Sequence, residues 1–276
     1  MSGASVLTFD KVALSFGKVN AVNGVSFTVE PDELFAIIGP NGAGKTSIFN
    51  VISGVYKPQT GAVKLHGESL LGKRPPQIAK LGVSRTFQNI ELFSNLTVID
   101  NLMLGRHQHI SYGPLAAMAW VGRARKQELE NRRAVEEIVD FLDLAQWRGL
   151  PVGLLPYGVQ KRVELGRALA MEPKLLLLDE PVAGMNLEET EDMARYILDI
   201  RSELHVPMIM VEHDMGLVMD LADRILVVDF GTPITVGTPA EVQRNEQVIR
   251  AYLGGDLDTA EPEPASTPAD STEVSS

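Results

Sequence analysis

The sequence contains no cysteine among its 276 residues and no long hydrophobic run. Without cysteine there is no disulfide framework, no thiol chemistry and no cysteine-ligated zinc site. Apolar runs such as Leu175–Leu178 and Ile225–Val228 have the length of a strand, far below the roughly 18–20 residues that span a bilayer. Residues Met1–Lys11 lack the charged-then-apolar pattern of a secretion signal. We therefore expect a protein that is soluble, or that reaches a membrane only through a partner.

Basic residues are also scarce relative to acidic ones. The chain has 25 Lys and Arg against 36 Asp and Glu, a formal net charge of −11. This balance argues against general nucleic-acid binding, which needs a basic face. The segment Asp256–Ser276 carries acidic residues without a basic one and almost nothing apolar. Such a segment cannot bury enough surface to offset its ordering entropy. We expect a disordered tail over 256–276 and one folded domain over 1–255.

A glycine-rich run after a buried strand is the most informative feature that is present. It consists of Gly39, Pro40, Asn41, Gly42, Ala43, Gly44, Lys45 and Thr46, and it matches the phosphate-binding pattern G-x-x-x-x-G-K-[ST]. The apolar run Leu34–Ile38 before it predicts a strand buried on both faces. The residues after it, Ser47–Ser53, predict a helix that ends at Gly54. Strand, glycine loop and helix together are the context of a P-loop, and they disfavour an ordinary glycine-rich turn.

The chemistry of this loop follows from its residue types. Glycine lets backbone N–H groups approach a phosphate chain without Cβ clashes. The helix N-terminus adds partial positive charge at the same place. We expect Lys45 to reach the β- and γ-phosphates, Thr46 to ligate Mg²⁺ through its hydroxyl, and Ser47 to belong to the same nucleotide-binding set.

The remaining patterns predict an α/β fold. Short β-rich runs over Val6–Val29 and at Ala62–His66 suggest an antiparallel β subdomain, and about 89–158 reads as a mostly helical insert. Helix and strand then alternate. The expected strands are Leu175–Leu178, Pro207–Val211 and Ile225–Val228, and the expected helices are Val98–Leu104, Ala134–Leu144, Val159–Met171, Glu188–Leu204 and a final pair capped by Thr238. This predicts a P-loop core with a mostly parallel sheet.

Two carboxylates follow the buried strand Leu175–Leu178. Acidic residues at strand ends are common, but downstream of a P-loop this is where a Mg²⁺-associated Asp belongs. We expect Asp179 to hold the metal through water and Glu180 to polarise the water that attacks the γ-phosphate. Two further side chains follow predicted strands: Gln88 after Val83–Phe87 and His213 after Ile209–Glu212. Neither is informative by itself, since a lone histidine is more often structural.

The segment from Leu155 opens a further helix, whose N-terminus offers backbone N–H groups to a phosphate, although an ordinary capped helix is the alternative. P-loop, Gln88, this segment, Asp179-Glu180 and His213 occur in the order of ABC-transporter ATP-binding subunits, and the resemblance covers about residues 5–254. It implies that Gln88 is the Q-loop glutamine, which contacts Mg²⁺ and the attacking water. It implies that His213 is the switch histidine near the γ-phosphate.

The same resemblance assigns residues to contacts between two subunits. Leu155–Gln160 is similar to the ABC signature, which closes over the ATP of the opposite subunit; its expected contacts are Leu155, Tyr157, Gly158 and Gln160. Residues Ala183–Asn186 resemble the D-loop. Phe16 lies where the family stacks an aromatic ring on adenine, and it fits a core strand position equally well.

One branch, the ATPases of branched-chain amino acid importers, resembles the chain more closely. The similar segments are Ser84–Ile90, Leu96–Val98, Leu155–Gly158, Ala183–Asn186 and Ala251–Gly254. The chain departs from the broad family pattern where Pro156 replaces the signature serine, Tyr157 replaces a glycine, Val159 replaces the glutamine, and Asn186 replaces the D-loop aspartate. Gly158 and the helix terminus remain as contributors there.

The resemblance implies an ATPase that uses ATP and Mg²⁺. Its expected partners are a second ATPase subunit, identical or related, transmembrane permease subunits that bind near Gln88–Leu104, and a periplasmic or extracellular substrate-binding protein; nucleic acid is not among them. The expected location is cytoplasmic, on the inner face of the plasma membrane. The alternatives are urea import, lipid export, a non-transport ABC ATPase, and a nucleotide-binding regulator, which Glu180 disfavours.

Overall fold

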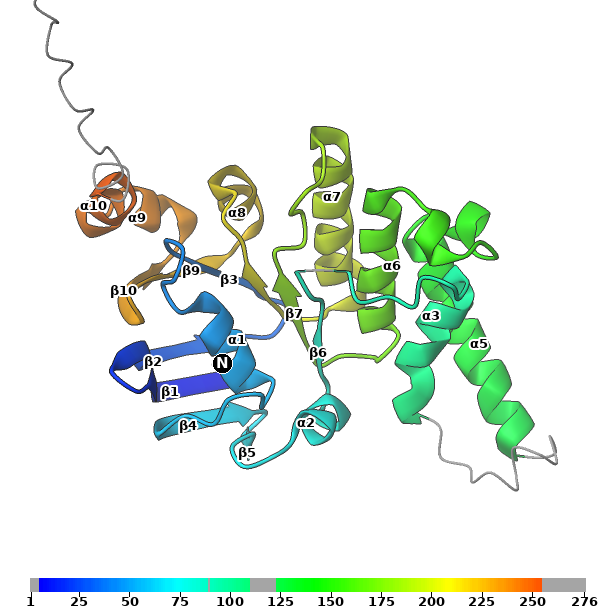
Figure 1. Ribbon diagram of the computed structural model, residues 1–276, viewed down its shortest axis with the longest axis horizontal. Coiled ribbons are helices and arrows are strands. Elements are labelled where there is room, and N and C mark those ends of the chain that lie inside the picture. The colour runs from blue at the N-terminus through cyan, green and yellow to red at the C-terminus, as the bar shows by residue number, and fades with distance from the viewer. Residues whose placement is uncertain (1–4, 89, 110–122, 255–276) are drawn as a thin grey trace, which may run out of the picture.

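Two β-sheets form the framework of the chain in the computed structural model, which describes residues 5–88, 90–109 and 123–254 (Figure 1). The six-stranded sheet has the order β10-β9-β3-β8-β7-β6. Its strands are β3 (Leu34–Ile38), β6 (Val83–Arg85), β7 (Leu175–Asp179), β8 (Met208–Val211), β9 (Arg224–Asp229) and β10 (Thr232–Gly237). All neighbours in it are parallel except β9 and β10. The carboxyl ends of the parallel strands therefore meet at one edge.

The second sheet is antiparallel and has the order β2-β1-β4-β5. Its strands are β1 (Leu7–Phe16), β2 (Val19–Val29), β4 (Thr60–Leu65) and β5 (Glu68–Ser69). Successive side chains of β3 point to opposite faces of the six-stranded sheet. One face packs on the antiparallel sheet, and the other packs on helices. Phe35 and Ile37 pack with the antiparallel sheet and with α1 (Lys45–Ile52), whereas Leu34, Ala36 and Ile38 pack in the helical core on the other face.

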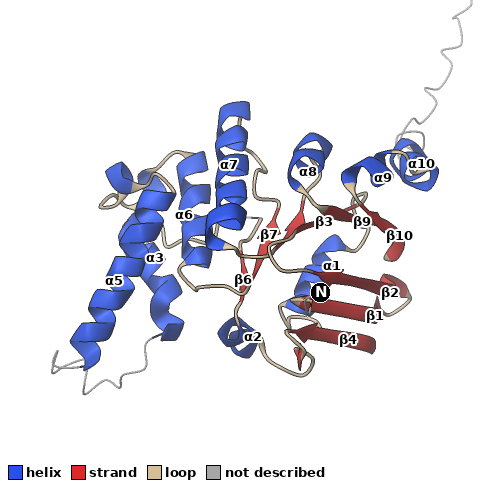
Figure 2. Cartoon of the chain, turned by 180° about the vertical axis from the view of Figure 1, so that it is seen from behind, coloured by secondary structure: helices blue, strands red, loops and turns tan. Residues whose placement is uncertain are grey.

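Helices cover the parallel sheet and extend beyond β6, as Figures 1 and 2 show from opposite sides. Besides α1 they are α2 (Pro75–Leu81), α3 (Val98–Gly105), α5 (Arg123–Phe141), α6 (Tyr157–Leu169), α7 (Leu187–Leu204), α8 (Met215–Leu221), α9 (Pro239–Gln243) and α10 (Glu246–Gly254), with 3₁₀ turns η1 (Arg106–His109), η2 (Ala145–Trp147) and η3 (Val152–Leu154). No helix within the described ranges combines the length and the apolar character that crossing a bilayer requires.

The predicted α/β fold is confirmed, with a mostly parallel sheet, an antiparallel sheet and a helical region. Thr238 caps α9 as expected, and Thr97 caps α3 in the same way, because each hydroxyl accepts an N–H of the first turn. The prediction missed α2, α8 and β10, which are short. It also began the helix of α5 at Ala134, eleven residues late, because the first turns of α5 are strongly charged and lack an apolar stripe. The acidic tail 256–276 lies outside the described residues, and the division into domains stays a prediction.

Candidate nucleotide-binding site

The glycine-rich loop 39–44 connects β3 to α1 at the carboxyl edge of the parallel sheet. Two of its glycines are required by close backbone contacts. A Cβ on Gly39 would lie 2.0 Å from the carbonyl oxygen of Val228, and one on Gly44 would lie 2.2 Å from the carbonyl oxygen of Ala21. Gly44, with φ 100°, is also the N-cap of α1. Strand β9 and strand β2 thus fix the loop from outside, and only glycine fits these positions.

Lys45 lies back over this loop. Its Nζ donates to the carbonyl oxygen of Gly39 at 2.6 Å and to that of Pro40 at 3.1 Å. Burial lowers the pKa of Lys45, and the negative charge of Glu180 opposes this shift. The ammonium and the N-terminus of α1 therefore face the same loop, so an anion that enters it meets two sources of positive charge.

Asp179 ends β7 and is held by a neighbour that the sequence did not single out. Its Oδ2 accepts from Nη2 of Arg85 at 2.6 Å, and Arg85 also donates to Asn50 on α1 at 2.8 Å. The backbone N–H of Asp179 donates to the hydroxyl of Thr86 at 3.3 Å. Asp179 is only 6% exposed. One carboxylate oxygen is thus paired with Arg85, and the orientation of the group is fixed.

Glu180, Gln88 and His213 come together directly beyond the strand ends. The Nε2 of Gln88 donates to Oε2 of Glu180 at 2.7 Å, and Nδ1 of His213 lies 3.9 Å from the same oxygen. Glu180 has φ 46°, in the left-handed region, which costs a non-glycine residue about 1–3 kcal/mol. Its N–H donates to the carbonyl oxygen of Val211, which holds this conformation. Two predicted residues that are far apart in the sequence, Gln88 and His213, therefore lie beside the carboxylate of Glu180, a third predicted residue.

Glu212 is a buried acid that sequence reasoning missed. It is fully buried, and its carboxylate accepts the N–H groups of Val182 at 3.2 Å and of His213 at 3.0 Å. Burial raises the pKa of Glu212, and these hydrogen bonds oppose the rise. The side chain joins the segment after Glu180 to the segment of His213. Its only signal in the sequence is an acid directly after an apolar strand.

The start of α6 lies apart from the P-loop. In both Figure 1 and Figure 2, α6 and α1 lie on opposite sides of β7. The N–H of Gly158 donates to Oε1 of Glu189 on α7 at 3.3 Å, so this donor is occupied within the chain, contrary to the expectation of an unoccupied helix terminus. The hydroxyl of Tyr157 donates to the carbonyl oxygen of Ala183 at 3.0 Å. The Nε2 of Gln160 donates to the carbonyl oxygen of Leu155 at 2.8 Å.

Two departures from the family pattern have structural roles. Val159 is 6% exposed and belongs to the core beneath α6 and α7, so a packing residue stands where the family has glutamine. Asn186 is the N-cap of α7: its side chain accepts the N–H of Glu189, and Glu189 accepts the N–H of Asn186 in return. Asparagine and aspartate are equally good N-caps, so this replacement leaves the helix start intact.

Phe16, at the end of β1, is 48% exposed. Its ring packs edge-to-face on Tyr56, with ring centroids 5.1 Å apart. The half-exposed ring differs from the buried strand residues around it, such as Leu14 and Val22. The interpretation of Phe16 as a core strand residue is therefore not supported, because about half of the residue is exposed.

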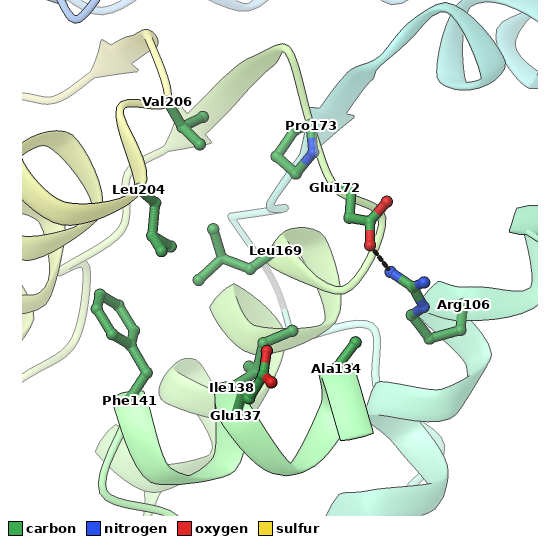
Figure 3. A pocket seen from close by; sticks show the side chains of 10 residues that line it. All are labelled: Arg106, Ala134, Glu137, Ile138, Phe141, Leu169, Glu172, Pro173, Leu204 and Val206. Atoms are coloured by element: carbon green, nitrogen blue, oxygen red, sulfur yellow. Dashed lines mark hydrogen bonds and ion pairs between the residues drawn. The ribbon is translucent and has the colours of Figure 1, made fainter. Parts of the chain in front are cut away.

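A cavity of about 430 Å³ lies in the helical region, away from these residues (Figure 3). Ile138 and Phe141 of α5, Leu169 of α6 and Leu204 of α7 line it, and Arg106 pairs with Glu172 beside it. None of the predicted site residues lines this cavity. It is separate from the carboxyl edge of the sheet, where the predicted residues gather.

Comparison with known proteins agrees with this geometry. Residues 22–183 match the family described as ABC transporter, and residues 232–258 match the one described as branched-chain amino acid ATP-binding cassette transporter. The chain therefore belongs to the ABC transporter ATPase family, and it is an ATPase of that class. The order of motifs had predicted this membership, which is confirmed.

Individual relatives cover nearly the whole chain. It is 39% identical to the high-affinity branched-chain amino acid transport ATP-binding protein BraF of Pseudomonas aeruginosa and 39% identical to LivG of Escherichia coli, each over 90% of this chain and 98% of the relative. A solved ATP-binding cassette of an ABC transporter in its ADP conformation is 28% identical, with a TM-score of 0.79 over 91% of this chain and 100% of that one. The predicted resemblance to the branched-chain amino acid branch is confirmed.

Proposed function

We propose that this chain is the ATP-hydrolysing subunit of an importer for branched-chain amino acids. The relatives BraF and LivG are transport ATP-binding proteins for these substrates, and the C-terminal match to the branched-chain family supports the same substrate class. The observation that carries the ATPase assignment is Glu180, which lies beside the P-loop and is held at 2.7 Å by Gln88.

The residues have distinct roles in this proposal. The loop 39–44 and Lys45 bind the phosphates, and Thr46 and Ser47 contact them from the first turn of α1. Glu180 accepts a hydrogen bond from the attacking water and takes a proton from it. At the same time the water oxygen bonds to the γ-phosphorus, and the bond between that phosphorus and the bridging oxygen of ADP breaks. Gln88 orients that water and Glu180, and His213 stabilises charge on the γ-phosphate.

The donor set at the loop fits Mg²⁺. This ion prefers oxygen ligands and keeps several waters when it is bound with substrate phosphates. Thr46 is exposed at the start of α1, and the Asp179 carboxylate has one oxygen paired with Arg85. The described residues contain no cluster of three or more acids or histidines that would form a metal cage by itself. Thr46, Asp179 and Gln88 would hold the ion, which neutralises phosphate charge when bound.

A single subunit supplies only part of the complete site. The start of α6 carries the signature but lies across β7 from the P-loop of its own chain (Figure 1). A head-to-tail pair of subunits would bring the α6 start of each one to the ATP of the other. Leu155, Tyr157, Gly158 and Gln160 would then form the contacts between the subunits, mainly through the backbone, because Pro156 offers no hydroxyl.

A groove next to the Q-loop is the place where we propose that a permease helix docks. It has a volume of about 480 Å³ and lies between α2, α3, α6 and the segment after β6. Ala79, Leu104 and Ala168 give it apolar walls, and Lys80 and Arg167 add positive charge. We infer that permease subunits dock here, which places the chain on the cytoplasmic face of the membrane, with a substrate-binding protein on the other side. Because the chain has no cysteine, a single Ala79→Cys crosslink to the permease tests this docking.

The decisive experiment on the ATPase assignment is Glu180→Gln. The amide keeps the size of the side chain but cannot take a proton, so hydrolysis should fall at least about 10²-fold while ATP still binds. ATP should then persist and hold a dimer that light scattering detects. Wild-type rates in this variant would refute the role of Glu180. Uptake of labelled leucine by vesicles that contain the permease and the binding protein tests the substrate separately.

A further inference from the structure

Helix α6 holds the Q-loop backbone through buried charged side chains. Lys161 is 3% exposed, and its Nζ donates to the carbonyl oxygens of Phe87 at 3.2 Å and of Gln88 at 2.8 Å. Glu164 is 1% exposed, and its Oε1 accepts the N–H of Phe87 at 3.2 Å. Farther along α6, Arg167 donates to the carbonyl oxygen of Glu91.

These side chains lie on one face of α6. Positions three residues apart are neighbours on a helix surface, so 161, 164 and 167 form a continuous row. We call Lys161 and Glu164 the clamp pair; their charged atoms are 3.7 Å apart. Burial raises the pKa of Glu164, and Lys161 opposes this rise. A buried ion pair usually contributes no more to the stability of the fold than apolar residues of similar size would, and often less. Stability of the fold alone therefore does not account for the clamp pair.

The backbone segment that the clamp pair holds includes Gln88. Gln88 has its carbonyl oxygen on Lys161 and its side-chain amide on Glu180. The same residue is thus fixed at its backbone by α6 and reaches the proposed catalytic carboxylate with its side chain. A shift of α6 along or across the sheet changes where the amide of Gln88 lies relative to Glu180.

We propose that Lys161 and Glu164 are positioning residues that hold the backbone of Gln88 against α6, so that the position of α6 on the sheet sets the distance between Gln88 and Glu180. The proposal rests on the ATPase function proposed above. α6 begins at Tyr157 in the signature, one turn before Lys161. In the two-subunit arrangement, a contact of the α6 start with the ATP of one subunit is therefore carried through the clamp pair to the hydrolytic site of the other.

The test removes both charges together, since removing one would leave the other buried and unpaired. In Lys161→Met/Glu164→Leu, kcat should fall about tenfold or more, because small misplacements of a catalytic group are costly. The KM and the equilibrium affinity for ATP should change less than about twofold, since the P-loop is untouched. The matched control is Arg162→Met, on the same helix, because Arg162 donates to Leu142 and Tyr196 and does not contact the Q-loop. Its kcat should stay within about twofold of wild type.

A double-mutant cycle separates positioning from a general loss of structure. If the clamp pair acts through Gln88, adding its substitutions to Gln88→Ala should cause no further loss of kcat. If the fold losses of kcat from Gln88→Ala and from the clamp-pair substitutions multiply in the combined variant, the two act independently and the proposal is overturned. If wild type shows no ATPase activity, or if Glu180→Gln is fully active, the proposed function fails instead, so the two failures are distinguishable.

Hydrogen exchange provides a readout that does not depend on turnover. The N–H of Phe87 donates to Glu164, so its exchange should speed up about tenfold or more when the acceptor is removed. If the double variant does not fold, Lys161→Gln/Glu164→Gln provides the test, because the amides keep a donor and an acceptor but leave no buried charge. It should show a smaller gain in exchange and a smaller loss of kcat. Unchanged exchange at the N–H of Phe87 in a folded variant would refute the clamp.

Discussion

The P-loop edge and the start of α6 carry the two most specific motifs of the chain, and their surroundings differ. At the P-loop edge the functional groups contact one another: Gln88 contacts Glu180, and Lys45 lies over its own loop. At the start of α6 the polar groups contact α7 and the segment before it, through Glu189 and Ala183. The first region is arranged for chemistry within one chain. The second keeps its donors on partners within the same chain, so a ligand that binds there would have to displace them.

Loss of the Lys45 ammonium should reduce ATP turnover more than any change at the start of α6. Lys45→Ala removes the ammonium at the loop, so turnover should fall more than about 10²-fold and nucleotide binding should weaken, because phosphoryl transfer depends on electrostatic stabilisation. Measured ATPase rates and nucleotide titrations check this. Lys64→Ala, an exposed lysine on β4, is the control and should behave as wild type. Near-normal turnover of Lys45→Ala would rule out the P-loop assignment.

At the start of α6 the effect should appear in hydrolysis and not in binding. A Cβ on Gly158 would lie 2.4 Å from Oε1 of Glu189, and the carboxylate of Gly158→Asp would also repel a phosphate there. Turnover should fall about tenfold or more, while ATP affinity of the separate subunit stays close to wild type. Pro156→Ala should be mild, because that residue offers no hydrogen-bonding side chain. Equal, small effects of both variants on turnover would show that this segment is only a helix start.

The carboxylate of Glu189 accepts the N–H of Gly158, the donor that a phosphate would use. In the Glu180→Gln background, Glu189→Gln should strengthen the ATP-dependent dimer a few-fold, since it removes like-charge repulsion, worth about 1 kcal/mol near the protein surface, where Glu189 is half-buried. Glutamine still serves the capping box. Glu188→Gln is the control: it is also in the first turn of α7, and it is exposed. An equal gain with Glu188→Gln would mean that only net charge matters.

The sequence predicted the P-loop edge well, because its signals are local. Five apolar residues before the loop form β3, and an apolar run before Asp179 forms β7. The contacts of Arg85 with Asp179 and of Glu189 with Gly158 were not predictable, since they join residues 94 and 31 positions apart. The role of Val159 was equally hidden. Its difference from the family glutamine is visible in the sequence, but its burial depends on how α6 packs against the sheet.

A similarly small effect is expected at Phe16, where a nucleotide would meet the antiparallel sheet. If its half-exposed ring stacks on adenine, Phe16→Ala should raise the KM for ATP about two- to tenfold, in line with about 0.5–1.5 kcal/mol for a stacked pair, with kcat unchanged. Phe16→Leu distinguishes stacking from packing, because leucine keeps apolar volume but has no ring. Stacking predicts that leucine fails like alanine and that Phe16→Tyr retains affinity. Because every base has a stacking face, GTP affinity should fall in parallel with ATP affinity. Wild-type KM values in Phe16→Leu together with a lowered melting temperature in Phe16→Ala would assign the ring to its contact with Tyr56 alone.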